Sequence, residues 1–292
     1  MSRAFIDSSS VAQAYDNWTN DALLERLWGE HIHLGYYGDP PRQRDFRAAK
    51  HDFVHELVRW SALAELPPGS TLLDVGCGIG GSARILAAHY GLDVLGISIS
   101  PAQIARAQAL TPPELAPRCR FAVMDALDLQ LADQSFDAVW SVEACPHMAD
   151  KQRYADELLR VLKPGGRLSV ADWNRRDASV APMNRLERWV MRQLLDNWAH
   201  PEFASIESLQ ANLQLSPYAA GMAIETGDWS RATLPAWLDS IIEGARRPAA
   251  VLGLGPRGLL LGLREIPTIL LMHWAFATGL MRFGVFRGQK PV

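Results

Sequence analysis

Residues 73–81, LDVGCGIGG, combine an acid with a run of glycines in a pattern that suits a ligand-binding loop. Asp74 stands in a short apolar run, and Gly76, Gly78 and Gly80 follow at alternate positions. Glycine lets the backbone approach a ligand closely, and ligands of open α/β sheets bind at the carboxyl ends of the strands. We interpret the segment as a ligand loop, with a purely structural glycine turn as the alternative.

The residues around the loop separate two kinds of cofactor. The glycines fit the dinucleotide motif G-x-G-x-x-G if Gly81 is counted, and also the G-x-G-x-G loop of S-adenosylmethionine (SAM) enzymes. A carboxylate at Asp74 suits the cationic SAM better than an anionic dinucleotide. About 20 residues on, where a dinucleotide site wants an acid, GISIS offers only Ser98 and Ser100. Asp125 ends a further predicted strand, where it could hold an adenine amino group, so SAM is favoured.

Strands that alternate with helices must position this loop. Buried strands are predicted over 71–76, 92–99, 119–127, 136–144 and 167–173, with helices over 81–91, 100–110 and 150–162 and a turn at 163–166. The alternation predicts a doubly wound, mostly parallel α/β sheet. Strand-like segments over 222–229 and 282–290 bring the expected total to seven.

The segments on either side of this core read as helical additions. We expect residues 1–65 to form a helical N-terminal lid region, 66–174 the cofactor-binding Rossmann-like core, and 175–292 cap helices with the last two strands. Helices are predicted near 183–198, 205–215 and 234–281. The additions are interleaved with the final strands, so the prediction is one integrated domain.

Composition restricts the functional class. The chain has 292 residues, 48% of them hydrophobic, and a net charge of −3 without a basic run, so nucleic acid is not an expected partner. Cys77, Cys119 and Cys145 have no metal-ligand spacing and predict neither a disulfide framework nor a metal site. The first residues, MSRAFIDSSS, lack the apolar segment of a signal peptide or anchor. We expect a cytoplasmic protein, and the sequence indicates no oligomeric state.

The core motifs resemble those of class I SAM-dependent methyltransferases. The similar segments are LLDVGCGIGGSARILA, GISISPAQIARA, FDAVWSVEACPHMADK and LRVLKPGGRLSVADW. The flanking segments AYDNWT, HIHLGYYG, MRQLLDNWAHPEFASIE, REIPTILLM and RFGVF are similar to the tocopherol and prenyl-quinol C-methyltransferases. The resemblance covers residues 8–288. It implies SAM as methyl donor, S-adenosyl-L-homocysteine as product, and a prenylated benzoquinol of tocopherol and plastoquinone biosynthesis as acceptor.

Alternatives remain open at this point. They are a γ-tocopherol or sterol-type C-methyltransferase, a small-molecule N-methyltransferase on the same scaffold, and a SAM-binding regulatory protein without turnover. The resemblance and the loop together predict a cofactor site. Its expected residues are Asp74, Gly76, Cys77, Gly78, Gly80, Ser98, Ile99, Gln103, Asp125, Ala126, Leu127 and Glu143.

The implied chemistry is methyl transfer to an aromatic carbon ortho to a hydroxyl. Phenols titrate at about pH 10, so a base strengthens the ring as a nucleophile, and histidine is the usual choice. His147 follows the fourth predicted strand, with Glu143 at that strand's end and His33 in the lid region. We predict catalytic roles for these three, with capping or packing as the alternative for each histidine.

The acceptor is expected to contact further polar and aromatic side chains. The candidate substrate residues are Tyr15, His31, Tyr36, Tyr37, Cys145 and Trp173. Trp28, Trp198 and Trp229 could line an apolar tunnel, whereas His51, His55, His89, His200 and His273 are expected to be surface or packing residues.

Residues 248–281 are mostly apolar, with Arg257, Arg264 and Glu265 as their charges. Pro256 and Pro267 are expected to break this segment into pieces too short to span a bilayer. One interpretation is a pair of cap helices packed on the sheet. The other is that the segment shelters a prenyl tail and contacts a membrane surface, which would make the protein peripheral.

Overall fold

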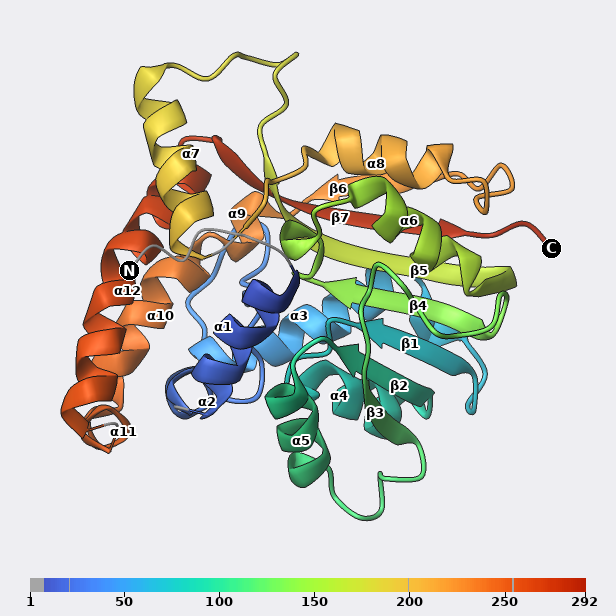
Figure 1. Cartoon of the computed structure of the whole chain (residues 1–292), viewed down its shortest axis with the longest axis horizontal. Coiled ribbons are helices and arrows are strands. Elements are labelled where there is room, and N and C mark those ends of the chain that lie inside the picture. Colours follow the sequence, from blue (N-terminus) through green and yellow to red (C-terminus); the bar gives the residue numbers. More distant parts are fainter. Residues whose placement is uncertain (1–7, 21, 199, 254) are drawn as a thin grey trace.

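The computed structural model describes residues 8–20, 22–198, 200–253 and 255–292, and its centre is a seven-stranded sheet (Figure 1). The strand order is β3-β2-β1-β4-β5-β7-β6, parallel except for β7, which runs antiparallel to both neighbours. The strands are β1 (Thr71–Val75), β2 (Asp93–Ser98), β3 (Cys119–Val123), β4 (Phe136–Val142), β5 (Leu162–Arg175), β6 (Glu225–Asp228) and β7 (Met281–Gln289). The predicted doubly wound, mostly parallel sheet is confirmed.

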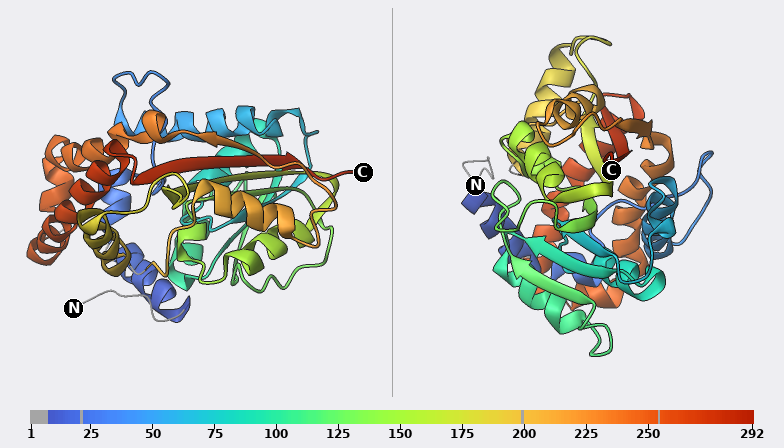
Figure 2. Two further views of the ribbon diagram at one scale, coloured as in Figure 1. Left: turned by 90° about the horizontal axis from the view of Figure 1, so that it is seen from above. Right: turned by 90° about the vertical axis from the view of Figure 1, so that its right-hand side faces the viewer.

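Helices cover both faces of the sheet. In the left view of Figure 2, α3 lies on one side of the strands and α6 and α8 lie on the other. The helices are α1 (Ser8–Asn20), α2 (Leu23–Trp28), α3 (Phe46–Trp60), α4 (Gly81–Tyr90), α5 (Pro101–Leu110), α6 (Lys151–Arg160), α7 (Arg185–Asn197), α8 (Ile206–Leu215), α9 (Ser230–Thr233), α10 (Pro235–Arg246), α11 (Pro248–Leu252) and α12 (Gly255–Ala277), with short 3-10 turns at Leu63–Glu65 and Cys145–His147.

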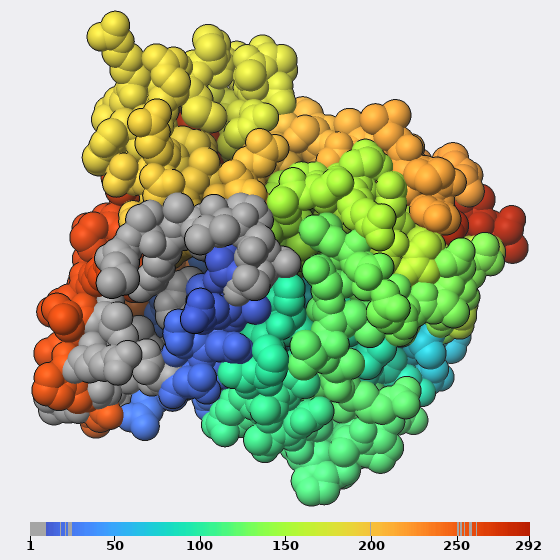
Figure 3. All heavy atoms as spheres, viewed as in Figure 1, coloured from blue at the N-terminus to red at the C-terminus, as the bar shows by residue number. Residues whose placement is uncertain are grey.

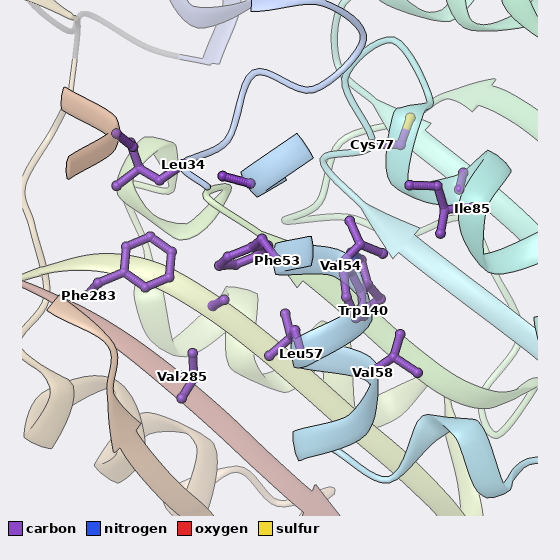
Figure 4. Packing of buried hydrophobic residues seen from close by; sticks show 14 of the residues in the cluster. Leu34, Phe53, Val54, Leu57, Val58, Cys77, Ile85, Trp140, Phe283 and Val285 are labelled. Atoms are coloured by element: carbon purple, nitrogen blue, oxygen red, sulfur yellow. The ribbon is translucent and has the colours of Figure 1, made fainter. Parts of the chain in front are cut away.

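The core between α3 and the sheet follows from a helical spacing of apolar residues. Phe53, Val54, Leu57 and Val58 of α3 are fully buried. They belong to one apolar cluster with Trp140 of β4, and Figure 4 shows Val54 beside the Trp140 ring and Phe53 directed toward Phe283 of β7. Burying a large apolar side chain stabilises a fold by about 1.5–3 kcal/mol. This packing fixes the sheet whose strand ends carry the loops described below.

Three local predictions were wrong, each for an identifiable reason. The turn expected at 163–166 is part of the extended β5, where Gly165 at φ 74° accompanies a register shift against β4. Only Glu225–Asp228 of the strand expected over 222–229 pairs with β7. Pro267 lies inside α12 instead of ending it. The lost backbone hydrogen bond is tolerated because Ile269 and Met272, in the next turn, are packed in the core.

The helical additions gather at one end of the sheet. In Figure 1, α1, α2, α7 and α10–α12 stand at the end toward which the parallel strands point. The space-filling view places α1 (blue) between the green core and the orange-red α12 (Figure 3). Within the described residues, no helix is both long enough and apolar enough to cross a membrane.

Candidate active site

A cavity of about 440 Å³ lies at the carboxyl ends of β1, β2 and β4. Eleven of the twelve predicted cofactor residues line it, namely Asp74, Gly76, Cys77, Gly78, Ser98, Ile99, Gln103, Asp125, Ala126, Leu127 and Glu143. Gly80 does not line it. This glycine precedes α4 at φ 83°, and a Cβ there would meet the Phe121 ring at 2.6 Å, so the absence of a side chain lets the loop pack on β3.

Asp74 gives this cavity an acidic floor. The side chain is 2% exposed, and its Oδ2 has no hydrogen-bond partner among the described residues. Burial raises the pKa of this carboxyl to about 7. A buried carboxylate without a partner is costly, and a cationic ligand would supply the missing charge. The site therefore fits the ammonium or sulfonium of SAM.

The loops around the cavity are held by their own hydrogen bonds. Ser98 donates through Oγ to Oε1 of Gln103 at 2.7 Å, and Ser100 caps α5 by accepting from the Gln103 backbone at 3.1 Å. Asp125 accepts through Oδ1 from the Leu127 backbone at 2.9 Å. Gly78 has φ 55°, and the space beside its Cα is open, so a ligand can approach the backbone there.

A second cavity, of about 460 Å³, opens among α2, α3, α10 and α12. Most of its lining is apolar and includes Trp28, Trp198, Trp237, Ile266 and Ile269. Five residues border both cavities and therefore mark their junction: Tyr15, Ile32, His33, His147 and Trp173. A cofactor in the first cavity and an acceptor in the second would meet at these side chains.

His147 is placed at this junction by the short 3-10 turn after β4. Its Nε2 lies 2.7 Å from the Tyr15 hydroxyl, and its Nδ1 is enclosed without a partner among the described residues. Burial lowers the pKa of the imidazole to about 3 and raises that of Tyr15 above its usual range, so both groups are neutral. A neutral imidazole with an unpartnered nitrogen can accept a proton.

His33 is held differently, because both of its ring nitrogens are engaged. Its Nδ1 donates to the Leu34 carbonyl at 2.8 Å, which leaves Nε2 to accept from Nδ1 of His31 at 3.1 Å. The backbone N–H of Leu34 donates to Oε1 of Glu143 at 2.8 Å. Burial lowers the pKa of His33 to about 3 and raises that of Glu143 to about 8. This arrangement favours a positioning role for His33 over that of a base.

Some predicted substrate residues lie away from both cavities. Tyr37 is buried and donates to Oδ2 of Asp239 at 2.9 Å, Tyr36 packs on Trp229, and Cys145 is enclosed in the core under β4. None of these four, Trp229 included, lines either cavity. The cavity linings therefore give no support to the prediction that Tyr36, Tyr37 and Cys145 contact the acceptor. Tyr15, His31 and Trp173 do line the cavities.

Two polar residues of the second cavity, Lys50 and His200, were not predicted from the sequence to be site residues. Lys50 is 1% exposed, donates to the His31 carbonyl at 2.6 Å and lies over the Phe46 ring at 4.3 Å; burial lowers its pKa to about 7. Lys50 shares one helix face with the apolar residues 46, 53 and 57, and this spacing could have predicted that it is buried. His200, expected to be a surface or packing residue, lines the cavity beside His147, and no periodicity marks it.

Comparison with known proteins agrees with this architecture. A family model described as "Methyltransferase domain" matches residues 73–170. The crystal structure of geranyl diphosphate C-methyltransferase from Streptomyces coelicolor A3(2), with S-adenosyl-L-homocysteine, superposes with a TM-score of 0.72 at 19% identity, covering 97% of each chain. The fold, the glycine loop and the acid-floored cavity define a class I SAM-dependent methyltransferase.

Relatives of known activity narrow the class. The chain is 57% identical over 288 residues to the 2-methyl-6-phytyl-1,4-hydroquinone methyltransferase of Synechocystis sp., covering 99% of this chain and 90% of that one. It is 31% identical to the chloroplastic tocopherol O-methyltransferase of Arabidopsis thaliana, covering 97% and 82%. The chain belongs to the prenyl-quinol branch of the SAM-dependent methyltransferases.

We expect SAM affinity to depend on the charge of Asp74. Asp74→Asn removes a charge-assisted hydrogen bond, so affinity should fall about ten- to a hundredfold. Because the pKa of Asp74 is about 7 without ligand, the parent should also lose about tenfold in affinity per pH unit below 7, as protonation removes the charge. The variant should lack this dependence.

Calorimetry with SAM at about pH 6 and about pH 8 measures both effects. Asp93→Asn, a change of a surface carboxylate at the start of β2, is the matched control and should bind like the parent. Parent-like affinity in a folded Asp74→Asn protein would remove Asp74 from the cofactor site.

Proposed function

We propose that this protein transfers the methyl group of SAM to a ring carbon of a prenylated benzoquinol, with 2-methyl-6-phytyl- and 2-methyl-6-solanyl-1,4-benzoquinol as acceptors. Such a step belongs to tocopherol and plastoquinone biosynthesis. The observation that carries the proposal is 57% identity, along 99% of the chain, to the Synechocystis 2-methyl-6-phytyl-1,4-hydroquinone methyltransferase. The geometry supports it, because an apolar cavity meets an acid-floored one at a histidine.

The residues of the site would have separate roles in binding the cofactor, binding the acceptor and transferring a proton. Asp74 and the backbone at Gly78 would hold SAM, which supplies a methyl group on a cationic sulfur. The apolar cavity would hold the prenyl tail and align the ring with the methyl group, and such positioning can itself supply a large part of the rate. His147 would take the proton of the ring hydroxyl, which makes the ortho carbon a stronger nucleophile. Glu143 and His33 would fix the lid segment that encloses the ring.

Product analysis tests the proposal directly. The purified protein is incubated with SAM and, separately, with the phytyl quinol, the solanyl quinol and γ-tocopherol, and the products are identified by mass spectrometry and NMR. We expect ring C-methylation of the two quinols. Methylation of γ-tocopherol alone would favour the tocopherol branch, and SAM binding without product from any acceptor would favour a regulatory protein.

We also propose that the cap contacts a membrane surface. Leu259, Leu260, Leu263 and Leu270 of α12 are 43–69% exposed, and Leu259 and Leu263 also line the apolar cavity. The cavity thus opens beside exposed apolar surface, at the place where a lipid-resident substrate would enter. Arg246, at the end of α10, is exposed and could face anionic headgroups.

We expect Leu260→Glu to weaken binding to anionic phospholipid vesicles severalfold, because it removes apolar contact and adds repulsion. Vesicle co-sedimentation measures the bound fraction. Leu215→Glu, at an exposed leucine (75%) of α8 on the other side of the molecule, is the control. Equal binding by the parent and both variants would place any membrane contact elsewhere.

A further inference from the structure

Two imidazole rings pack against each other at the inner end of the apolar cavity. The ring centroids of His147 and His200 are 4.4 Å apart, with the planes tilted by 35°. His200 is 3% exposed, and its ring centroid is 5.7 Å from that of Trp173 and 4.9 Å from that of Phe203. Both histidines line the cavity, so an acceptor ring bound there would lie beside both of them.

Three nitrogens of this pair lack partners among the described residues. They are Nδ1 of His147 and both Nδ1 and Nε2 of His200. The backbone carbonyl of Pro146 is close enough to the His200 ring to favour its protonated form, but it makes no aligned hydrogen bond with either nitrogen. Burial and the neighbouring His147 and Lys151 lower the pKa of His200 well below its usual value. The ring is therefore neutral, with one N–H to donate and one nitrogen to accept. Leaving such groups buried and unpaired is costly, which points to a polar ligand atom.

The neighbouring charged groups do not supply that atom. Lys151 donates to the backbone carbonyls of Cys145, at 2.8 Å, and Met148. Tyr15 occupies Nε2 of His147. When Nε2 carries the hydrogen and donates to the Tyr15 oxygen, Nδ1 of His147 presents a lone pair.

We propose that His147 and His200 bind a single ring hydroxyl of the acceptor from two sides, with His147 accepting its proton and His200 donating to its oxygen. A phenol hydroxyl can donate one hydrogen bond and accept another, so one oxygen satisfies both rings. In the proton transfer, the O–H bond breaks, a bond forms between the proton and Nδ1 of His147, and the electron pair stays on oxygen. The N–H of His200 then stabilises the phenolate. This inference rests on the proposed function only in taking the acceptor to be a phenol.

A nitrophenol reports on this pair without methyl transfer, because its phenolate absorbs visible light. The protein is saturated with S-adenosyl-L-homocysteine, 4-nitrophenol is bound, and its ionisation is titrated by absorbance. We expect the parent to favour the bound phenolate. His200→Phe should shift the ionisation constant about ten- to a hundredfold toward the neutral phenol, since a hydrogen bond to a charged group is lost.

Two further variants make the test specific. His200→Asn keeps an N–H donor and should retain part of the effect. His273→Phe makes the same change at another histidine with a buried, unpartnered nitrogen, one that lines neither cavity, and should ionise the probe like the parent. An unchanged ionisation in folded His200→Phe, a shift caused by His273→Phe instead, or a parent that does not perturb the probe would each overturn the inference. Because no prenyl quinol is used, failure of the proposed function would be seen separately, in the product analysis.

Discussion

Replacement of His147 by alanine is expected to lower kcat on the phytyl quinol by about 10²–10⁴-fold, the usual loss when a general base is removed. The His147 ring lies at the junction of the two cavities, and its enclosed Nδ1 has no hydrogen-bond partner among the described residues. The pKa near 3 applies to the imidazole without substrate. A phenolate formed beside the ring would offset the cost of the imidazolium, because opposite charges at short range favour each other in a buried site.

Steady-state kinetics and SAM calorimetry together test this expectation. The variant should bind SAM with nearly parent affinity, which separates a loss of chemistry from a loss of the cofactor. His89→Ala, at an exposed histidine of α4, is the matched control and should keep parent kcat. Turnover of His147→Ala within a fewfold of the parent would mean that the base lies elsewhere.

The second large effect concerns the prenyl tail. Each buried methylene contributes about 0.8 kcal/mol, so an acceptor cut to one isoprene unit should lose at least about a hundredfold in kcat/KM. The loss should appear mainly in KM, because the tail lies far from the reacting carbon. Both acceptors are assayed fully solubilised in the same detergent, so that partitioning does not enter the comparison.

A variant that fills the cavity gives the reciprocal test. Gly244 of α10 lines the apolar cavity, and among the described residues a Cβ there would meet only Val251, at 4.0 Å. Gly244→Leu should therefore fold and should lower kcat/KM for the phytyl acceptor while leaving that for the short acceptor nearly unchanged. Equal efficiency for long and short acceptors in the parent protein would show that this cavity holds no tail.

The residues that line the cavity at the strand ends could be predicted because they are adjacent in sequence to the strands that carry them. Asp74, the glycines and Asp125 stand at strand ends, and parallel strands bring their carboxyl ends to one edge. Gly80 was predicted to bind the cofactor, and the structure gives its missing side chain a packing reason as well, because a Cβ there would meet the Phe121 ring. A motif shows where the backbone must be close to something, but not what that neighbour is.

The acceptor half was less predictable because it is assembled from segments distant in sequence. His147 and His200 are 53 positions apart in the sequence and come into contact only in the folded chain. Tyr36 packs on Trp229, just before α9, and Tyr37 donates to Asp239 of α10. Pro267 is a further example, because proline usually ends a helix, whereas the burial of neighbouring residues keeps α12 continuous through it. Only the burial of Lys50 could have been predicted from the sequence, because this lysine lies on the apolar face of a predicted helix.

The division into two cavities with five shared lining residues has a consequence for how such enzymes diversify. The donor cavity is built largely by residues 74–149, whereas the outer part of the acceptor cavity is built by α10–α12, which enter the chain between β6 and β7. Exchange of α10–α12 between homologues should thus transfer tail-length preference as a unit. Mutations in these helices can change which lipophilic acceptor is bound without altering the residues of the methyl donor cavity.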